Sequence, residues 1–227
     1  MNFLVDRTMP SDMICELSKL GTVYKSAYID FADKAVTTHP DLQIHFLDDK
    51  LAVCAQEVYS YYKKILPADV ELLKGRAALG CTYPDNCAYN IARVGKNVIC
   101  NTKFADKLIL EIYKERVYNI INVNQGYTKC NVCPISDNII LTEDKGIYNV
   151  LKSTSGIETI LLKNNSANLE GFEYGFIGGA SGKCYETILF CGMIYCEIFS
   201  ILQEKNVNFV QLSNSELYDY GSILSFG

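Results

Sequence analysis

Two cysteines with the spacing of a metal-binding or redox pair, Cys130 and Cys133, lie in the segment YTKCNVCP. A zinc-chelating pair needs a second pair of ligands, and neither His39 nor His45 has the spacing that would supply one. A thioredoxin-type pair opens a helix, whereas this pair is followed directly by Pro134. The motif therefore favours neither chemistry, and we expect no metal and no cofactor.

The ten cysteines are better explained as core side chains than as a disulfide framework. They lie mostly in apolar segments such as LAVC, NVIC and ILFCGMIYC, where a thiol behaves as a small hydrophobic group. Cysteine-rich disulfide scaffolds are typical of small secreted domains, and this chain has 227 residues, 49% of them hydrophobic. Most of the thiols are therefore predicted to be buried.

Composition and charge exclude two classes of partner. The formal net charge is −5 and the basic residues are scattered, so no basic face can replace counterions on a phosphate backbone. No apolar run reaches the roughly 18 to 20 residues of a membrane span, and the start has no signal-peptide pattern. We expect a soluble, cytoplasmic, single-domain protein that binds neither nucleic acid nor membranes.

The elements that must position any site come from an internal repeat. Five segments share the order apolar strand, polar turn, amphipathic helix and second apolar strand; they are residues 2–27, 51–73, 97–123, 138–162 and 187–212. Before each repeat after the first, and again at the end of the chain, comes a stretch that begins with a ring. These anchor residues recur every 44 to 47 residues, at His39, Tyr83, Tyr127, Tyr174 and Tyr220.

This repeat predicts a closed ring of five β-β-α-β units. The last anchor stretch, YGSILSFG, has no strand after it, and its expected partner, NFLVD, opens the chain. The two ends should therefore meet, and a closed ring needs no capping repeat. The sequence predicts an α/β fold with pseudo-five-fold symmetry over residues 1–227.

The arrangement resembles the pentein fold, the five-bladed α/β propeller of the guanidino-modifying enzymes. These include arginine deiminase, agmatine deiminase, dimethylarginine dimethylaminohydrolase and the amidinotransferases. The segments HPDLQIH, GYTKCNVC and YGFIGGASG resemble more closely an uncharacterised, mostly clostridial bacterial family that is assigned to this fold without a known reaction. The resemblance covers the whole chain.

The resemblance implies a cysteine nucleophile near the C-terminus, a histidine that moves protons, and carboxylates that hold a guanidinium. This chain departs from that pattern. Its last unit contains no cysteine, both histidines belong to the first unit, and the cysteine after GGASGK, Cys184, lies in the fourth. A direct copy of the known active site is therefore not expected.

Candidate pore-facing residues follow from the two-residue period of a strand, counted from each anchor. The even positions are the more polar, so they are predicted to face the pore while the odd positions pack under the helices. They are Asp41, Asp85, Lys129, Phe176 and Ser222; then Gln43, Cys87, Asn131, Gly178 and Leu224; then His45, Tyr89, Cys133, Ala180 and Phe226. On this count Cys133 faces the pore and Cys130 faces the core.

The predicted site combines a nucleophile, an acid/base and a cation clasp. Cys133 or Cys87 would attack as a thiolate, which a nearby His45 imidazolium would favour. Asp41 and Asp85 would hold a guanidinium by charge-assisted hydrogen bonds. Positions two and six of one strand lie about 13 Å apart, so the ligand is elongated or one of these pairs is not part of the site.

Further binding candidates are Asn131, Gln43, Lys129, His39, Gly178 and Gly179. Each candidate has a structural alternative. His45 could be a hydrogen-bonded core residue, and His39 could be a ring that replaces the usual tyrosine. An aspartate after proline commonly caps a turn, and Lys129 could neutralise the aspartates. The glycines could admit close backbone contact, with a flexible loop at Ser181 and Gly182.

Two functions fit these residues. The first is a cysteine-dependent hydrolase or transferase that acts on a guanidinium- or amide-containing small molecule, with a cationic ligand expected in a polar pore. The second is a non-catalytic binding protein, as is the ribosome anti-association factor of the same fold; the missing C-terminal cysteine favours it. A homo-oligomer is also compatible with the sequence, because helices surround the predicted ring and their outer faces are available for pairing.

Overall fold

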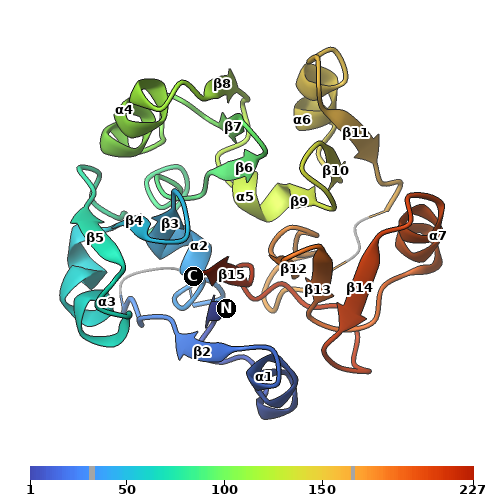
Figure 1. Ribbon diagram of the computed structural model, residues 1–227, viewed down its shortest axis with the longest axis horizontal. Helices are drawn as coiled ribbons and strands as arrows, with labels where there is room; N and C mark the ends of the chain where they lie inside the picture. The colour runs from blue at the N-terminus through green and yellow to red at the C-terminus, as the bar shows by residue number, and fades with distance from the viewer. Residues whose placement is uncertain (31–33, 165–166) are drawn as a thin grey trace.

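Five small sheets of three strands each surround a common centre in the computed structural model, which describes residues 1–30, 34–164 and 167–227 (Figure 1). In every sheet the middle strand pairs with an antiparallel inner strand and a parallel outer strand. A parallel pair needs a crossover connection, which the helix of each unit supplies. The fold is a five-bladed α/β propeller, as the repeat predicted.

The inner, middle and outer strands and the helix of each blade have the following bounds. The first has β15 (Leu224–Phe226), β1 (Asn2–Val5), β2 (Thr22–Lys25) and α1 (Ser11–Ser18). The second has β3 (Ile44–Phe46), β4 (Leu51–Cys54), β5 (Glu71–Lys74) and α3 (Tyr59–Ile65), with η1 (Gln56–Val58) before the helix. The third has β6 (Ala92–Val94), β7 (Asn97–Cys100), β8 (Asn119–Asn122) and α4 (Lys107–Glu115).

The last two blades follow the same order. The fourth has β9 (Cys133–Pro134), β10 (Ile139–Thr142), β11 (Glu158–Leu161) and α6 (Lys145–Leu151). The fifth has β12 (Ser181–Cys184), β13 (Thr187–Phe190), β14 (Asn208–Gln211) and α7 (Cys196–Glu204). Ser181 and Gly182, predicted in a flexible loop, are instead the first residues of β12.

The helices form where the sequence supplies both a cap and an apolar stripe. The carboxylate of Asp106 accepts hydrogen bonds from the backbone N–H groups of Leu108 and Ile109 at the start of α4. Ile109 and Tyr113, one turn apart, are then both buried. The Asp144 carboxylate caps α6 through the N–H of Ile147 in the same way.

The two ends of the chain close the ring. β1 pairs antiparallel with β15, with Phe3 opposite Ser225, and Figure 1 places both termini near the centre. Phe226 is fully buried and stacks on Phe46 of the next blade, with ring centroids 4.4 Å apart. The predicted meeting of the termini is therefore confirmed.

The sequence had predicted a strand directly after each anchor, and this is wrong at all five, because turns or a helical turn come before each inner strand. After His39 and after Tyr127 the chain first makes one helical turn, α2 (Pro40–Gln43) and α5 (Thr128–Asn131), and only then enters β3 or β9. Proline suits the first turn of a helix because its φ is fixed and its missing N–H is not needed there. A helical turn rotates successive side chains by about 100°, so the two-residue count fails over these residues.

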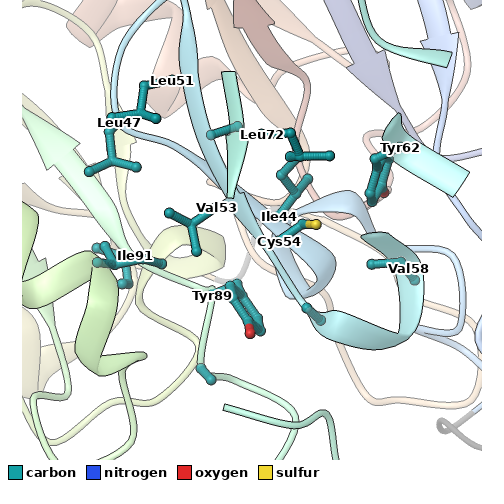
Figure 2. Packing of buried hydrophobic residues seen from close by; sticks show 14 of the residues in the cluster. Ile44, Leu47, Leu51, Val53, Cys54, Val58, Tyr62, Leu72, Tyr89 and Ile91 are labelled. Atoms are coloured by element: carbon teal, nitrogen blue, oxygen red, sulfur yellow. The ribbon is translucent and has the colours of Figure 1, made fainter. Parts of the chain in front are cut away.

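Apolar side chains fill the blades and the spaces between them. One buried cluster joins the first three blades, and Figure 2 shows Ile44, Val53, Cys54, Tyr62 and Tyr89 among its members. Seven of the ten cysteines are buried, in keeping with their predicted role as core side chains. Within the described residues, no helix is long and apolar enough to span a membrane.

Replacing Phe226 by alanine should destabilise the protein by about 3 to 5 kcal/mol, because it removes a fully buried ring at the contact that closes the propeller. Chemical denaturation followed by circular dichroism measures this free energy of unfolding. Tyr28, whose side chain is 59% exposed, provides the control: Tyr28→Ala should change the value by less than about 0.5 kcal/mol. Equal effects of the two variants would contradict closure by β15.

Candidate functional site

Two cavities lie at the centre of the propeller. The larger has a volume of about 820 Å³ and is lined by the inner strands and their hairpins, including Asp41, His45, Arg93, Lys129 and Lys183. We call it the wide cavity. The smaller has a volume of about 250 Å³ and is lined by four of the five anchors, His39, Tyr83, Tyr127 and Tyr174. We call it the aromatic cavity.

Aromatic rings form the walls of the smaller cavity. Phe172 and Phe176 join the three anchor tyrosines, and the rings of Tyr83 and Tyr127 lie 5.3 Å apart. The Tyr127 hydroxyl donates a hydrogen bond of 2.9 Å to the Asn86 side chain, which also lines the cavity. The repeat therefore brings one ring from each of several blades to the same place.

The polar part of the aromatic cavity consists of Asp219, His39, Cys130 and Asn86, all at least 95% buried. His39 Nδ1 lies 4.0 Å from Asp219 Oδ1. The Asp219 carboxylate also accepts 2.9 Å hydrogen bonds from the N–H groups of Phe176 and Gly221. Burial is the main cause that raises the pKa of Asp219, with His39 opposing it and Asp41 adding to it.

Glycine at position 179 makes room for this carboxylate. A Cβ built on Gly179 would lie 2.0 Å from Asp219 Oδ1, which no real side chain tolerates. The backbone N–H of Gly179 also donates to the carbonyl of Cys130, so it holds the cysteine turn against the acid. The sequence predicted that this glycine admits a close contact with its backbone, and the group that makes this contact is the Asp219 carboxylate.

A hydrogen-bonded network connects the two cavities. Asp41 Oδ2 accepts from the Ser222 hydroxyl at 2.7 Å and from the Cys130 thiol at 3.2 Å. Lys129 Nζ lies 3.0 Å from Ser222 Oγ and 3.3 Å from the carbonyl of Gly178. Cys130 lines the aromatic cavity, whereas Asp41 and Lys129 line the wide one. The network therefore links the Cys130 thiol in one cavity to the charged groups Asp41 and Lys129 in the other.

Two features of this network are unusual for buried groups. Asp41 Oδ1 is buried and has no hydrogen-bond partner within the described residues. Ser222 has a φ of +72°, a left-handed conformation that costs energy for a residue other than glycine. Such a conformation persists only where surrounding contacts impose it, and the bonds of Ser222 to Asp41 and Lys129 do so here.

The surroundings of Cys130 favour its protonated thiol. Burial is the largest cause that raises its pKa well above the usual value, and the nearby charges of Asp41 and Asp219 add to it. Asn90 donates a hydrogen bond to the sulfur at 3.1 Å and acts in the opposite direction. The Asp41 carboxylate accepts a hydrogen bond from this thiol, so it is placed to receive the proton if the thiol ionises.

The orientation predicted for Cys130 and Cys133 is reversed. Cys130 lines the aromatic cavity, whereas Cys133 packs in an apolar cluster with Ile177 and Ala180. The reason is α5, whose helical turn places Cys130 toward the centre before the chain enters β9 at Cys133. Burial raises the pKa of Cys133 to about 11, so its thiolate is disfavoured. Within the described residues, no three His, Cys, Asp or Glu side chains are grouped to hold a metal.

Cys87, the other predicted nucleophile, is part of a turn. Its thiol donates a hydrogen bond of 2.9 Å to the carbonyl of Pro84, and burial raises its pKa to about 12. Asp85 in the same turn is exposed and lines neither cavity. The structure therefore does not bring Asp85 to Asp41, and these two do not form a clasp.

His45, predicted as the acid/base, is held neutral. Its Nε2 lies 2.6 Å from the Tyr113 hydroxyl, and the ring lines the wide cavity with Asp41 and Lys129. Burial, together with the charges of Arg93 and Lys129, lowers its pKa to about 3. An imidazole with this pKa is uncharged at neutral pH, with a proton on only one of its two ring nitrogens.

The remaining candidates support the backbone. The Gln43 side chain bonds both the N–H and the carbonyl of Ala27, at 3.1 and 2.9 Å. Asn131 Nδ2 donates to the carbonyl of Tyr127 at 2.9 Å. Gly178 presents its carbonyl to Lys129 and Ser222. Of the residues named from the sequence, the structure thus gathers His39, Asp41, Lys129, Gly178 and Gly179 around one centre.

Sequence reasoning missed Asp219, Cys130 and Asn86 as site residues. Ser222 was placed at the pore by the count from its anchor, but no role followed from it. Asp219 comes directly before the anchor Tyr220, and one other unit has an acid there, Glu173 before Tyr174. The count began at the anchor, so it could not reach this residue.

Comparisons with known proteins agree on the fold. The model of a family described as "Family of unknown function (DUF6873)" matches residues 4–224. Dimethylarginine dimethylaminohydrolase (DDAH) from Pseudomonas aeruginosa, in a mutant form complexed with citrulline, matches with a TM-score of 0.59 and 8% identity, over 95% of this chain and 92% of that chain. SxtG, an amidinotransferase from Microseira wollei, matches with a TM-score of 0.57 and 11% identity, over 93% and 88%.

A third solved structure, a dimethylarginine dimethylaminohydrolase adduct with S-methyl-L-thiocitrulline, matches with a TM-score of 0.60 and 7% identity, over 93% of this chain and 92% of that chain. No curated protein matches the sequence. These structures have the pentein fold, and so does this chain. The resemblance seen in the sequence is therefore confirmed at the level of the fold.

Acid should destabilise the protein partly through His45. The pKa of this imidazole is about 3 when folded and 6.5 in its ordinary state, so below pH 6.5 the unfolded chain takes up a proton that the folded chain does not. Between pH 7 and pH 5 the wild type should lose about 2 kcal/mol more than His45→Gln. Urea unfolding at the two pH values measures the difference, and parallel losses would contradict a neutral His45.

Alkylation should separate the cysteines into two groups. Cys15, Cys81 and Cys196 are exposed, whereas Cys87 and Cys133 are buried with raised pKa values. Iodoacetamide at pH 7.5 should therefore modify the first three roughly a hundredfold faster, because the thiolate is the reactive form. Peptide mass spectrometry over time gives the rates; fast modification of Cys133 in the folded protein would restore it as a candidate nucleophile.

Proposed function

The chain belongs to the DUF6873 family and has the pentein fold, and from this premise we propose that it acts on a guanidinium-containing small molecule in the aromatic cavity, with Cys130 as the nucleophile. One observation carries the proposal: Cys130, His39 and Asp219 line the same aromatic-walled cavity. The reaction is hydrolysis of the guanidinium group or its transfer to an acceptor. The solved structures of this fold include DDAH complexed with citrulline and an amidinotransferase.

The cavity suits a planar cation. Aromatic faces attract a cation held within about 6 Å of the ring, and a buried carboxylate without a full charge partner is costly until a cation reaches it. Asp219 has only His39 at 4.0 Å and two backbone N–H groups. A guanidinium can donate two parallel hydrogen bonds to one carboxylate, and the charge so bound would lower the raised pKa of Asp219.

The same positive charge would activate the thiol. A cation beside Cys130 favours the thiolate, and the thiol proton can pass to Asp41, which already accepts its hydrogen bond at 3.2 Å. The thiolate then forms a carbon–sulfur bond at the central guanidinium carbon. The carbon–nitrogen bond to the leaving amine breaks, and that amine takes a proton from the imidazolium form of His39.

The second half of the reaction restores the enzyme. Water, or the amine of an acceptor, gives a proton to His39 and attacks the same carbon. The carbon–sulfur bond breaks, and the sulfur takes back the proton held by Asp41. Hydrolysis releases a urea-type product, whose oxygen gives its remaining proton to the released amine or to solvent, and transfer releases a new guanidine. His39 thus takes the acid/base role predicted for His45, and Asp219 takes the cation-binding role predicted for Asp41 and Asp85, while Asp41 accepts the thiol proton.

Binding without turnover is the second candidate function. The observation that favours it is the raised pKa of Cys130, which the acids Asp41 and Asp219 increase further. If a bound cation does not offset these charges, the thiol stays protonated and the cavity only holds its ligand. The two candidates share the cavity and differ in the ionisation of one sulfur.

Two variants separate binding from chemistry. Asp219→Asn should weaken the binding of guanidinium compounds at least about tenfold, because it removes a charge-assisted contact. Cys130→Ser should bind normally and lose at least about a hundredfold in turnover. Calorimetry with a panel of methylguanidine, agmatine and arginine gives the affinities, and ammonia, amine and urea assays give the turnover.

Cys196→Ser, at an exposed thiol, is the matched control and should change neither quantity. A wild type that binds members of the panel without any product would support the binding function instead. A wild type that binds none of them, or an Asp219→Asn variant that binds as the wild type does, would overturn the proposal.

A further inference from the structure

The lining of the aromatic cavity contains no lysine or arginine among the residues that the structure describes, and its one imidazole, His39, lies beside Asp219. It consists of aromatic and aliphatic groups with His39, Thr82, Asn86, Cys130 and Asp219 as its polar members. Asp219 supplies the carboxyl group of the lining and is buried in it. A ligand group that enters the cavity therefore meets a carboxylate and ring faces, and no lysine or arginine.

Two lysines lie close in sequence to lining residues, but neither lines the aromatic cavity. Lys129 is next to Cys130, but its Nζ contacts Ser222 and the Gly178 carbonyl and lines the wide cavity instead. Lys34 precedes the lining residue Val36 by two positions, is exposed, and does not line the cavity. Neither is placed to accept a ligand carboxylate inside the aromatic cavity.

The segments that supply the walls carry acids on their exposed side. Glu170 and Glu173 flank Phe172 in the same stretch that ends in Tyr174, and Asp85 lies between Tyr83 and Asn86. All three are exposed, and none forms an ion pair with the described part of the chain. The exposed side of the lining segments, which we call the approach to the cavity, thus has a net negative charge, with these three acids against one lysine, Lys34.

We infer that the aromatic cavity selects guanidinium compounds without a carboxylate, above all those with a second positive charge at the far end, such as aminoalkylguanidines, and discriminates against guanidino amino acids. The inference rests on the proposed function. An α-carboxylate would lose water without meeting a lysine or arginine, because the lining holds neither and His39 already faces Asp219, and it would be repelled by the acidic approach. Citrulline, the ligand in the DDAH complex, is an amino acid with such a carboxylate. The cavity of this chain therefore serves a different substrate class on the same fold.

The size of the cavity agrees with a short, unbranched ligand. About 250 Å³ lies just below the range of about 300 to 1,000 Å³ that is usual for small-molecule pockets. A guanidinium on a linear alkyl chain can place its planar head at Asp219 and its chain between the rings. The far end of the chain then reaches the acidic approach.

Agmatine and L-arginine are the matched probes, because they differ by one carboxylate. Calorimetry at low ionic strength should give agmatine an affinity at least about tenfold higher than that of arginine. Arginine methyl ester, in which the carboxylate charge is removed, should bind nearly as well as agmatine. Added salt should reduce the difference, because the exposed acids are screened.

A charge reversal at the approach tests the cause. Glu173→Lys should raise the affinity for arginine and lower that for agmatine, so that their ratio falls about threefold or more. Glu115→Lys, which changes the net charge equally at an exposed site on α4, should leave the ratio unchanged. Equal effects of the two variants would show that net charge alone, and not this rim, sets the preference, and would overturn the inference.

The failure of the inference and that of the proposed function look different. If agmatine and arginine bind equally, or arginine binds more tightly, the selectivity is wrong while guanidinium binding stands. If neither compound nor methylguanidine binds to the wild type, the proposed function itself falls, and the inference falls with it. An agmatine preference that Glu173→Lys reduces and Glu115→Lys does not would support both.

Discussion

The antiparallel pairing of β15 with β1 is the constraint on which the centre of this protein depends. It joins the last residues of the chain to the first, and it brings the final anchor stretch against the first one. Asp219 then lies beside His39, and Ser222 reaches Asp41, across sequence separations of about 180 residues. An open array of the same five units would separate both pairs. The polar network at the centre is thus a product of ring closure rather than of any single blade.

Closure also forces charges into the interior, and the surrounding backbone is shaped to tolerate them. Asp41 and Asp219 are each 1% exposed. Hydrogen bonds from Ser222, Cys130 and backbone N–H groups satisfy most of their oxygens, and glycine at position 179 leaves the space that Asp219 fills. Two buried acids with a single lysine bonded through a serine leave negative charge uncompensated. That imbalance is the physical reason to look for a cationic ligand at this place.

The fold by itself does not decide what such a centre does. The related structures share the propeller at 7 to 11% identity, and at that distance the side chains of a site are free to change. Here the last unit contains no cysteine, while Cys130 comes from a different unit. A similar set of chemical groups, a thiol, an imidazole and carboxylates, can therefore be assembled around the axis from other blades. Pseudo-symmetry makes this possible because every blade contributes the same positions.

The sequence alone determined the features that arise from local periodicity. Five repeats of strand, helix and strand, the recurrence of an anchor ring every 44 to 47 residues and the missing strand after the last anchor were enough to predict a closed five-bladed propeller. They were enough because each unit must bury its own apolar face in the same way. The spacing of hydrophobic residues along the sequence shows directly which face of each element is apolar and must be buried.

Only the tertiary structure decided which polar residues share a cavity. The one-turn helices α2 and α5 rotate the side chains that a strand count had placed, so Cys130 replaces Cys133 at the centre and His45 turns to Tyr113. Asp219 meets His39 only because the ring is closed. The tertiary structure also decides ionisation, because the pKa of a buried thiol or imidazole depends on its burial and on charges from other blades. None of these contacts leaves a periodic trace in the sequence, because they join residues that the chain keeps far apart.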